Sequence, residues 1–185
     1  MTATALDPHT ALVLIDLQNG TLGRGLVHQS ADIVARSVAL ANAFADRDMT
    51  IVIVRATGTP AGRTEYSASM PDGFPPEFAE LHPDIDAIGS AVRVDKSSWG
   101  AFVGTDLHGE LSARGITQVV LAGVATSFGV ESSAREAYDL GYNVAIAIDA
   151  ISDARAASHD HVVSSVFPAL AELATTDDIL ALLKK

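Results

Sequence analysis

The sequence predicts an α/β fold in which a largely parallel sheet is covered by helices on both faces. Short runs of apolar and β-branched residues alternate along the chain with segments whose apolar residues recur at helical spacing. The chain also has 185 residues, of which 48% are hydrophobic and 19% charged, so it can bury one sizeable core. Strands and helices that alternate in this way form parallel sheets with right-handed crossovers. We expect residues 1–185 to form a single domain.

The strands are predicted where apolar runs end at polar or glycine residues. Four runs meet this description, at residues 11–15, 51–54, 119–121 and 143–148. A fifth, shorter strand is predicted at 91–94, and a sixth, at the edge of the sheet, at 172–175.

The helices are predicted between these runs. Helical spacing is carried by Ile33, Val34, Val38, Leu40 and Phe44, then by Leu107 and Leu111, then by Val130, Ala134, Ala137 and Tyr138. Two further helices are predicted at 156–170 and 177–183. Thr176, which acidic residues follow, is expected to be the N-cap of the last helix.

Residues 57–90 depart from this pattern. The segment holds five of the seven prolines, and it also contains Tyr66, Phe74 and Phe78. A connection of this length in a compact domain is usually functional or disordered. Its aromatic content favours an ordered excursion that walls a pocket or docks on a neighbouring subunit, and the alternative is a solvent-exposed insertion.

Composition and charge exclude several classes of protein. Twelve Lys and Arg residues stand against 23 Asp and Glu, and a net charge of -11 with no basic patch predicts no binding to nucleic acid. The chain has no cysteine, which excludes disulfides, thiolate metal sites and a cysteine nucleophile. Residues 1–10 show no secretory leader and no apolar run could span a bilayer, so we expect a cytoplasmic protein without a membrane partner.

Candidate site residues follow the strands, because ligands of doubly wound sheets bind beyond the carboxyl ends of the strands. Asp16 directly follows a strand and should be buried, so it needs a cationic partner or strong hydrogen bonds. Lys96 can supply the cation if the two strands are neighbours, and the pair would form an acid–base couple. Solvated strand-end residues are the alternative.

The stretch at 123–129, GVATSFG, is predicted to be a strand-to-helix turn. Successive backbone N–H groups of such a turn face a common point and can bind an anion or oxyanion. The alternative is an ordinary turn in which Thr126 or Ser127 merely caps the helix.

Three segments together resemble the isochorismatase-like hydrolase superfamily. They are ALVLIDLQNG, KSSWGAF and GVATSFGVESSAREAYDLGYNVAIAIDA, in this order and spacing. The resemblance covers about residues 9–185. It implies a three-layer α/β/α sandwich, Rossmann-like, with a mostly parallel six-stranded sheet, and a homo-oligomer such as a dimer or tetramer.

The resemblance also implies roles for individual residues. Asp16 matches the general base and Lys96 the lysine of the amidase branch, while Gly129 stands where that branch has its nucleophilic cysteine. The oxyanion hole matches the amides of Ala125 and Gly129, and a cis peptide bond is implied between Val124 and Ala125.

Three readings of a site without cysteine remain open. One is vinyl-ether cleavage, in which Asp16 protonates the substrate, as in isochorismatases, which also have glycine at this position. Another is amide or ester hydrolysis by a water molecule that Asp16 deprotonates. The third is an inactive family member that binds a small molecule or serves assembly. Ser127 is a less favoured nucleophile, since it precedes the matching position by two residues.

A small-molecule substrate is expected in a pocket lined by Gln18, Trp99, Phe102, Thr126 and Phe128. Arg55, Arg63 and Arg93 could bind a substrate carboxylate, but solvated or salt-bridged surface positions are favoured for all three. His159 and His161 lie two residues apart on a predicted helix and point to different faces, which argues against a shared metal site. We predict no metal and no cofactor. The leading hypothesis is a cofactor-independent hydrolase that uses Asp16 and Lys96.

Overall fold

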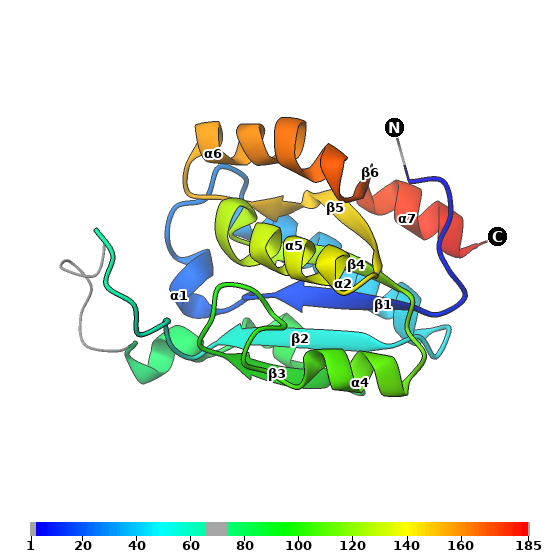
Figure 1. Cartoon of the computed structure of the whole chain (residues 1–185), viewed down its shortest axis with the longest axis horizontal. Coiled ribbons are helices and arrows are strands. Elements are labelled where there is room, and N and C mark those ends of the chain that lie inside the picture. Colours follow the sequence, from blue (N-terminus) through cyan, green and yellow to red (C-terminus); the bar gives the residue numbers. More distant parts are fainter. Residues whose placement is uncertain (1–2, 66–73, 185) are drawn as a thin grey trace.

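A single sheet forms the centre of the computed structural model, which describes residues 3–65 and 74–184 (Figure 1). Its strands are β1 (Thr10–Ile15), β2 (Ile51–Ala56), β3 (Val92–Lys96), β4 (Gln118–Val124), β5 (Asn143–Ser152) and β6 (Glu172–Ala174). All described pairings between these six strands are parallel, and the strand order is β3-β2-β1-β4-β5-β6. The chain therefore starts in the middle of the sheet and fills first one half and then the other. Since the order reverses at β1, the switch point lies between β1 and β4.

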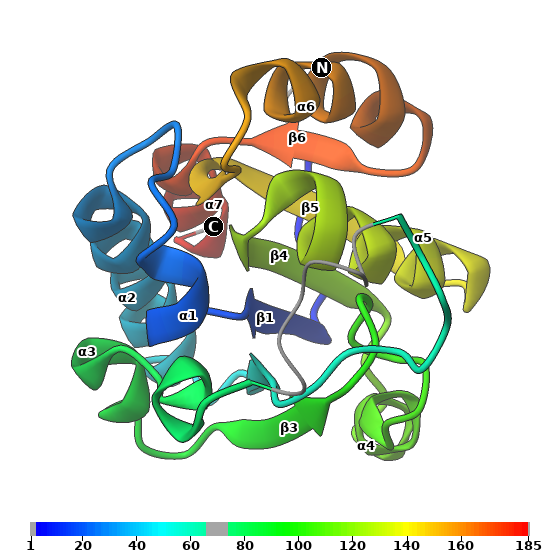
Figure 2. The same cartoon turned by 90° about the vertical axis from the view of Figure 1, so that its left-hand side faces the viewer.

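The described helices lie on both faces of this sheet. They are α1 (Asn19–Leu22), α2 (Ser30–Ala45), α3 (Pro83–Asp86), α4 (Leu107–Ala113), α5 (Glu131–Asp139), α6 (Ala156–His161) and α7 (Thr176–Leu183). Short helical turns occur at Pro76–Ala79, Thr126–Val130, Val162–Val166 and Phe167–Ala169. Figure 2 shows α2 and α7 on one face and α4 and α5 on the other. The predicted three-layer α/β/α architecture is confirmed.

A hydrophobic cluster lies on each face of the sheet, between the sheet and the helices, and β1 contributes residues to both clusters. Leu12 and Leu14 pack with the buried side of α2, whereas Val13 and Ile15 pack with the buried side of α5. All four side chains are completely buried. A strand whose two faces are both covered reads as a continuous apolar run, which explains why residues 11–15 contain no polar position.

Several predicted boundaries were wrong. β3 runs to Lys96 rather than ending at 94, and β5 runs to Ser152 rather than 148. The extension of β5 follows a register shift in its pairing with β4 between Leu121 and Gly123. Such an irregularity has no signature in the apolar pattern.

The predicted N-cap of α7 was also wrong by one residue. Thr175, not Thr176, is the cap: its hydroxyl accepts a hydrogen bond from the amide of Asp178, whose carboxylate accepts one from the amide of Thr175. This reciprocal pair is a capping box, which satisfies two backbone donors at the start of the helix.

The segment 57–90 is more regular than expected where the structure describes it. It contains the turn Pro76–Ala79 and the helix α3, and Leu81 forms an isolated antiparallel bridge with Gln18. Residues 75–86 therefore pack on the chain that follows β1. Tyr66 and Pro71 lie outside the described residues, so the predicted excursion stays a prediction there.

Candidate active site

Asp16 and Lys96 meet at the carboxyl ends of β1 and β3. The Lys96 ammonium donates to Asp16 Oδ2 at 2.9 Å, and both side chains are buried. Asp16 has a φ of 52°, a left-handed conformation that Asp tolerates better than most residues. The predicted contact between these two residues is confirmed.

The Lys96 ammonium has no free donor. Besides Asp16 it donates to the carbonyl oxygens of Trp99, at 2.8 Å, and Ser98, at 3.1 Å. An ammonium carries three N–H bonds, so all three have acceptors. Lys96 thus balances the charge of Asp16 and fixes one of its oxygens, and at the same time it ties down the loop that carries Trp99.

The second oxygen of Asp16 is buried without a partner. No hydrogen bond to Oδ1 is found within the described part of the chain. Burial raises the pKa of Asp16 to about 6, because desolvation disfavours the carboxylate, and the charge and hydrogen bond of Lys96, together with a smaller effect of the Ala56 backbone, offset this only in part. Asp16 therefore has one oxygen that is fixed and one that can take up or release a proton near neutral pH.

The turn after β4 lies directly against this carboxylate. The peptide bond between Val124 and Ala125 is cis, as the family resemblance implies. Phe128 and Val130 both donate their amides to the carbonyl of Ala125, which closes the turn Thr126–Val130. Among residues 3–65 and 74–184, nothing accepts the amide of Ala125, and the amide of Gly129 makes no hydrogen bond outside this turn.

Gly129 faces Asp16 across a very short gap. A Cβ at position 129 would lie 2.9 Å from Asp16 Oδ2 and 3.1 Å from Ile15 Cγ2. Real Cβ atoms essentially never approach this closely, so the carboxylate occupies space that a side chain at 129 would need.

Two buried side chains, those of Asp153 and His159, form hydrogen bonds with residues of this turn. Asp153 Oδ2 accepts both the amide of Ser127, at 2.8 Å, and its hydroxyl, at 2.7 Å. His159 Nδ1 lies 2.9 Å from the hydroxyl of Thr126, and burial lowers the pKa of His159. The Ser127 hydroxyl is thus held by Asp153.

Sequence reasoning missed the part that Asp153 and His159 play at this turn. Asp153 follows the unpredicted extension of β5, and His159 was weighed only as a metal ligand. A strand prediction that continued past 148 would have placed Asp153 at the carboxyl end of the sheet.

The predicted pocket residues divide into two groups. Trp99 is 52% exposed and meets Phe128 edge-to-face, with ring centroids 4.9 Å apart. These two rings form an aromatic pair on the loop and the turn that hold Lys96 and Gly129.

The other three pocket candidates are buried and engaged elsewhere. Gln18 donates to the carbonyls of Ala56 and Phe78 and accepts the amide of Ala56. Its side chain therefore joins the chain after β1 to the end of β2 and to the turn Pro76–Ala79. Phe102 packs in the core beside Tyr142, and Thr126 has no exposed surface. Contact of these three side chains with a substrate stays a prediction.

Two of the three arginines considered as substrate ligands are engaged in ion pairs. Arg55 makes a bidentate pair with Asp95, and Arg93 pairs with Asp86. In the described ranges no three His, Asp or Glu residues gather as a metal site requires, and no helix there is long and apolar enough to cross a membrane. The lack of a metal or cofactor stays a prediction.

Comparison with known proteins agrees with the resemblance. The model of the isochorismatase domain matches residues 10–178, which is most of the chain. The chain belongs to the isochorismatase family. It is 38% identical to the isochorismatase family protein YecD of Escherichia coli O157:H7 over 177 residues, covering 92% of this chain and 94% of YecD. It is 35% identical over 181 residues to YwoC of Bacillus subtilis, another member, covering 95% of this chain and 94% of YwoC.

Solved structures of the isochorismatase family share the same architecture. A family protein from Burkholderia thailandensis has a TM-score of 0.90 at 38% identity, covering 98% of each chain. The pyrazinamidase of Pyrococcus horikoshii in complex with zinc has a TM-score of 0.75 at 21% identity, covering 91% of this chain and 99% of that one, and its likeness concerns the fold alone. Membership in the family supports a hydrolase in general terms.

Proposed function

We propose that this member of the isochorismatase family is a cofactor-independent hydrolase that cleaves an amide or ester of a small molecule by direct attack of water. Asp16 is the general acid–base, and the amides of Ala125 and Gly129 bind the developing oxyanion. The observation that carries the proposal is that Asp16, whose Oδ1 is buried without a described partner, lies against Gly129 in a turn where nothing described accepts the amide of Ala125. A buried polar atom without a partner is costly in a structural role, and catalytic sites are a common exception.

The pairing with Lys96 assigns different tasks to the two oxygens of Asp16. Oδ2 is held by the ammonium, so proton transfer is assigned to Oδ1. In the first step Oδ1 takes a proton from water while the hydroxide forms a bond to the carbonyl carbon. In the second step the carbon–nitrogen or carbon–oxygen bond breaks, and the leaving group takes the proton from Oδ1. Lys96 stays protonated throughout and balances the charge of Asp16.

The backbone of the turn favours acyl chemistry over vinyl-ether cleavage. Attack on a carbonyl develops negative charge on oxygen, which backbone N–H groups stabilise. Protonation of a vinyl ether develops positive charge, which the same N–H groups would oppose. The unpartnered amide of Ala125, in the same turn as Gly129, which lies against Asp16, therefore supports amide or ester hydrolysis.

A substrate panel tests the proposal. It contains primary amides, N-carbamoyl compounds, simple esters and isochorismate, and each is given to the wild type, to Asp16→Asn and to Asp32→Asn. Asp32 is an exposed aspartate in α2, so it controls for the same chemical change away from the site. We expect turnover of an amide, carbamoyl compound or ester that is lost in Asp16→Asn and kept in Asp32→Asn.

The pH dependence gives a second readout. Because attack needs ionised Asp16, kcat/KM should rise through pH 6 and then level off. Turnover of isochorismate alone would replace acyl chemistry with vinyl-ether cleavage. Folded protein that turns over no member of the panel would favour the alternative of a binding or assembly protein.

A further inference from the structure

The outer edge of β3 is an open edge of the sheet. β3 pairs with β2 on one side, and no strand in the described part of the chain pairs with it on the other. An open edge presents a row of unpaired N–H and C=O groups, which is a template for a further strand.

The hydrogen-bonding pattern identifies which residues of β3 face outward. Thr57 donates its amide to the carbonyl of Lys96, and Lys96 is in register with Ala56. Residues along a strand alternate in the side to which their backbone groups point. Val92, Val94 and Lys96 therefore bond to β2, while the backbone groups of Arg93 and Asp95 point to the open edge.

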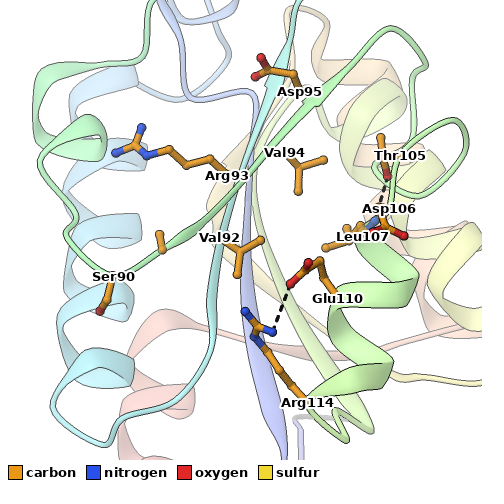
Figure 3. Close-up of a pocket in the computed structure, with 11 residues that line it drawn as sticks. Ser90, Val92, Arg93, Val94, Asp95, Thr105, Asp106, Leu107, Glu110 and Arg114 are labelled. Atoms are coloured by element: carbon orange, nitrogen blue, oxygen red, sulfur yellow. Dashed lines mark hydrogen bonds and ion pairs between the residues drawn. The ribbon is translucent and has the colours of Figure 1, made fainter.

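A groove runs along this edge. Its volume is about 680 Å³, and residues 90–95 line it on one side and Glu110 and Arg114 of α4 on the other. In Figure 3 the side chains of Val92 and Val94 point toward α4, and that of Arg93 points away from it. Val92 and Val94 give the groove an apolar floor beside the unpaired backbone.

The charged side chains of Arg93 and Asp95 favour one register for the pairing of β3 with β3 of a second copy. In an antiparallel pair of β3 strands centred on Val94, each Arg93 would lie opposite an Asp95 of the second copy. Each Asp95 would then lie between that arginine and its own partner Arg55, which it contacts at 2.7 Å, and each Arg93 between that aspartate and its own partner Asp86, which it contacts at 2.6 Å. Centring the pair on Arg93 or on Asp95 would instead oppose like charges, which is destabilising. The outward backbone groups of Arg93 and Asp95 also match the hydrogen-bonded positions of the pairing centred on Val94.

We propose that β3 pairs with β3 of a second copy of this chain, antiparallel and around a two-fold axis at Val94. The partner is a second copy because the charge pattern Arg93–Val94–Asp95 is complementary to itself when reversed. The two sheets then join into one continuous sheet. This inference is independent of the proposed hydrolase activity.

A disulfide tests the register directly, since the chain has no cysteine of its own. The two Val94 residues would form a non-hydrogen-bonded pair, whose Cα atoms lie about 4.5 Å apart, within the range of a disulfide. We expect Val94→Cys to form a covalent dimer on oxidation. Val92→Cys is the matched control: it lies on the same face of the same strand, but its opposite residue is Lys96, so it should remain uncrosslinked.

Sedimentation of the wild type and of Asp95→Arg completes the test. The wild type should be a dimer, and Asp95→Arg, which opposes two arginines across the axis, should be a folded monomer by circular dichroism. A monomeric wild type, a dimer in which Val94→Cys stays reduced, or equal crosslinking of Val92→Cys would each overturn the proposal. If Asp95→Arg does not fold, the comparison of crosslinking in Val94→Cys and Val92→Cys alone tests the proposal.

Discussion

Ser127 donates both its backbone amide and its hydroxyl to the same carboxylate oxygen of Asp153, at 2.8 and 2.7 Å. Asp153 is almost completely buried, and it comes from the end of β5 rather than from the turn itself. The turn between β4 and α5 is therefore held by a residue that directly follows the neighbouring strand β5. This turn also contains Gly129, which lies against Asp16.

Asp153→Ala should destabilise the fold by about 1–3 kcal/mol, because it leaves the amide of Ser127 without its acceptor. Ser127→Ala removes only the hydroxyl bond, so its cost should be smaller, about 0.5–1.5 kcal/mol. Urea unfolding of both variants measures the difference. Equal stability of Asp153→Ala and the wild type would show that the hydrogen bonds from Ser127 to Asp153 contribute nothing to the stability of the fold.

Asp16→Asn should remove a pH dependence of stability. Burial raises the pKa of Asp16 from 3.8 to about 6, so between these values the folded state binds more protons than the unfolded state. Stability therefore falls as pH rises through this window, by about 3 kcal/mol in total, and is then constant. The difference in unfolding free energy between the wild type and Asp16→Asn, measured from pH 4 to pH 7, isolates this contribution. Parallel curves for the two proteins would contradict the raised pKa.

Lys96→Met should destabilise the protein by about 3–5 kcal/mol, since it leaves a buried carboxylate without its cation. Adding Asp16→Asn to Lys96→Met removes that uncompensated charge, so the double variant should be more stable than Lys96→Met alone. A double-mutant cycle by urea unfolding measures the coupling. Additive effects would mean that the 2.9 Å contact carries no interaction energy.

Gly129→Ala should cost about 1–3 kcal/mol, because its Cβ would force Asp16 Oδ2 and Ile15 to move. Gly89→Ala is the control: no atom lies within 4 Å of a Cβ there, and its stability should stay within about 1 kcal/mol of the wild type. Thermal unfolding of both variants gives the comparison. If Gly129→Ala matched the control, the carboxylate would have to be free to move aside.

The fold and the central pair of the site were predictable because their signals are local. Asp16 follows an uninterrupted apolar run, and parallel strands bring such run-end residues to one edge of the sheet. Lys96 was identified in the same way, although the strand that carries it was predicted two residues too short.

The supporting residues were not predictable by this reasoning. Asp153 lies 26 residues from Ser127, and His159 lies 33 residues from Thr126. Asp153 also follows the part of β5 that lies beyond the register shift with β4, which no periodicity encodes. The choice between Thr175 and Thr176 as the cap likewise depended on backbone geometry at a single residue.

The loop that receives the Lys96 ammonium also contains the only tryptophan of the chain. Trp99 accepts one hydrogen bond from Lys96 through its carbonyl, and Lys96 reaches Asp16 across 80 residues of sequence. The indole ring of Trp99 contacts Phe128 in the turn after β4. The tryptophan fluorescence of this protein therefore arises from a single residue, which lies where the segments that carry Asp16, Lys96 and Phe128 meet. The recovery of this fluorescence during refolding would report the rate at which the site assembles, without any added label.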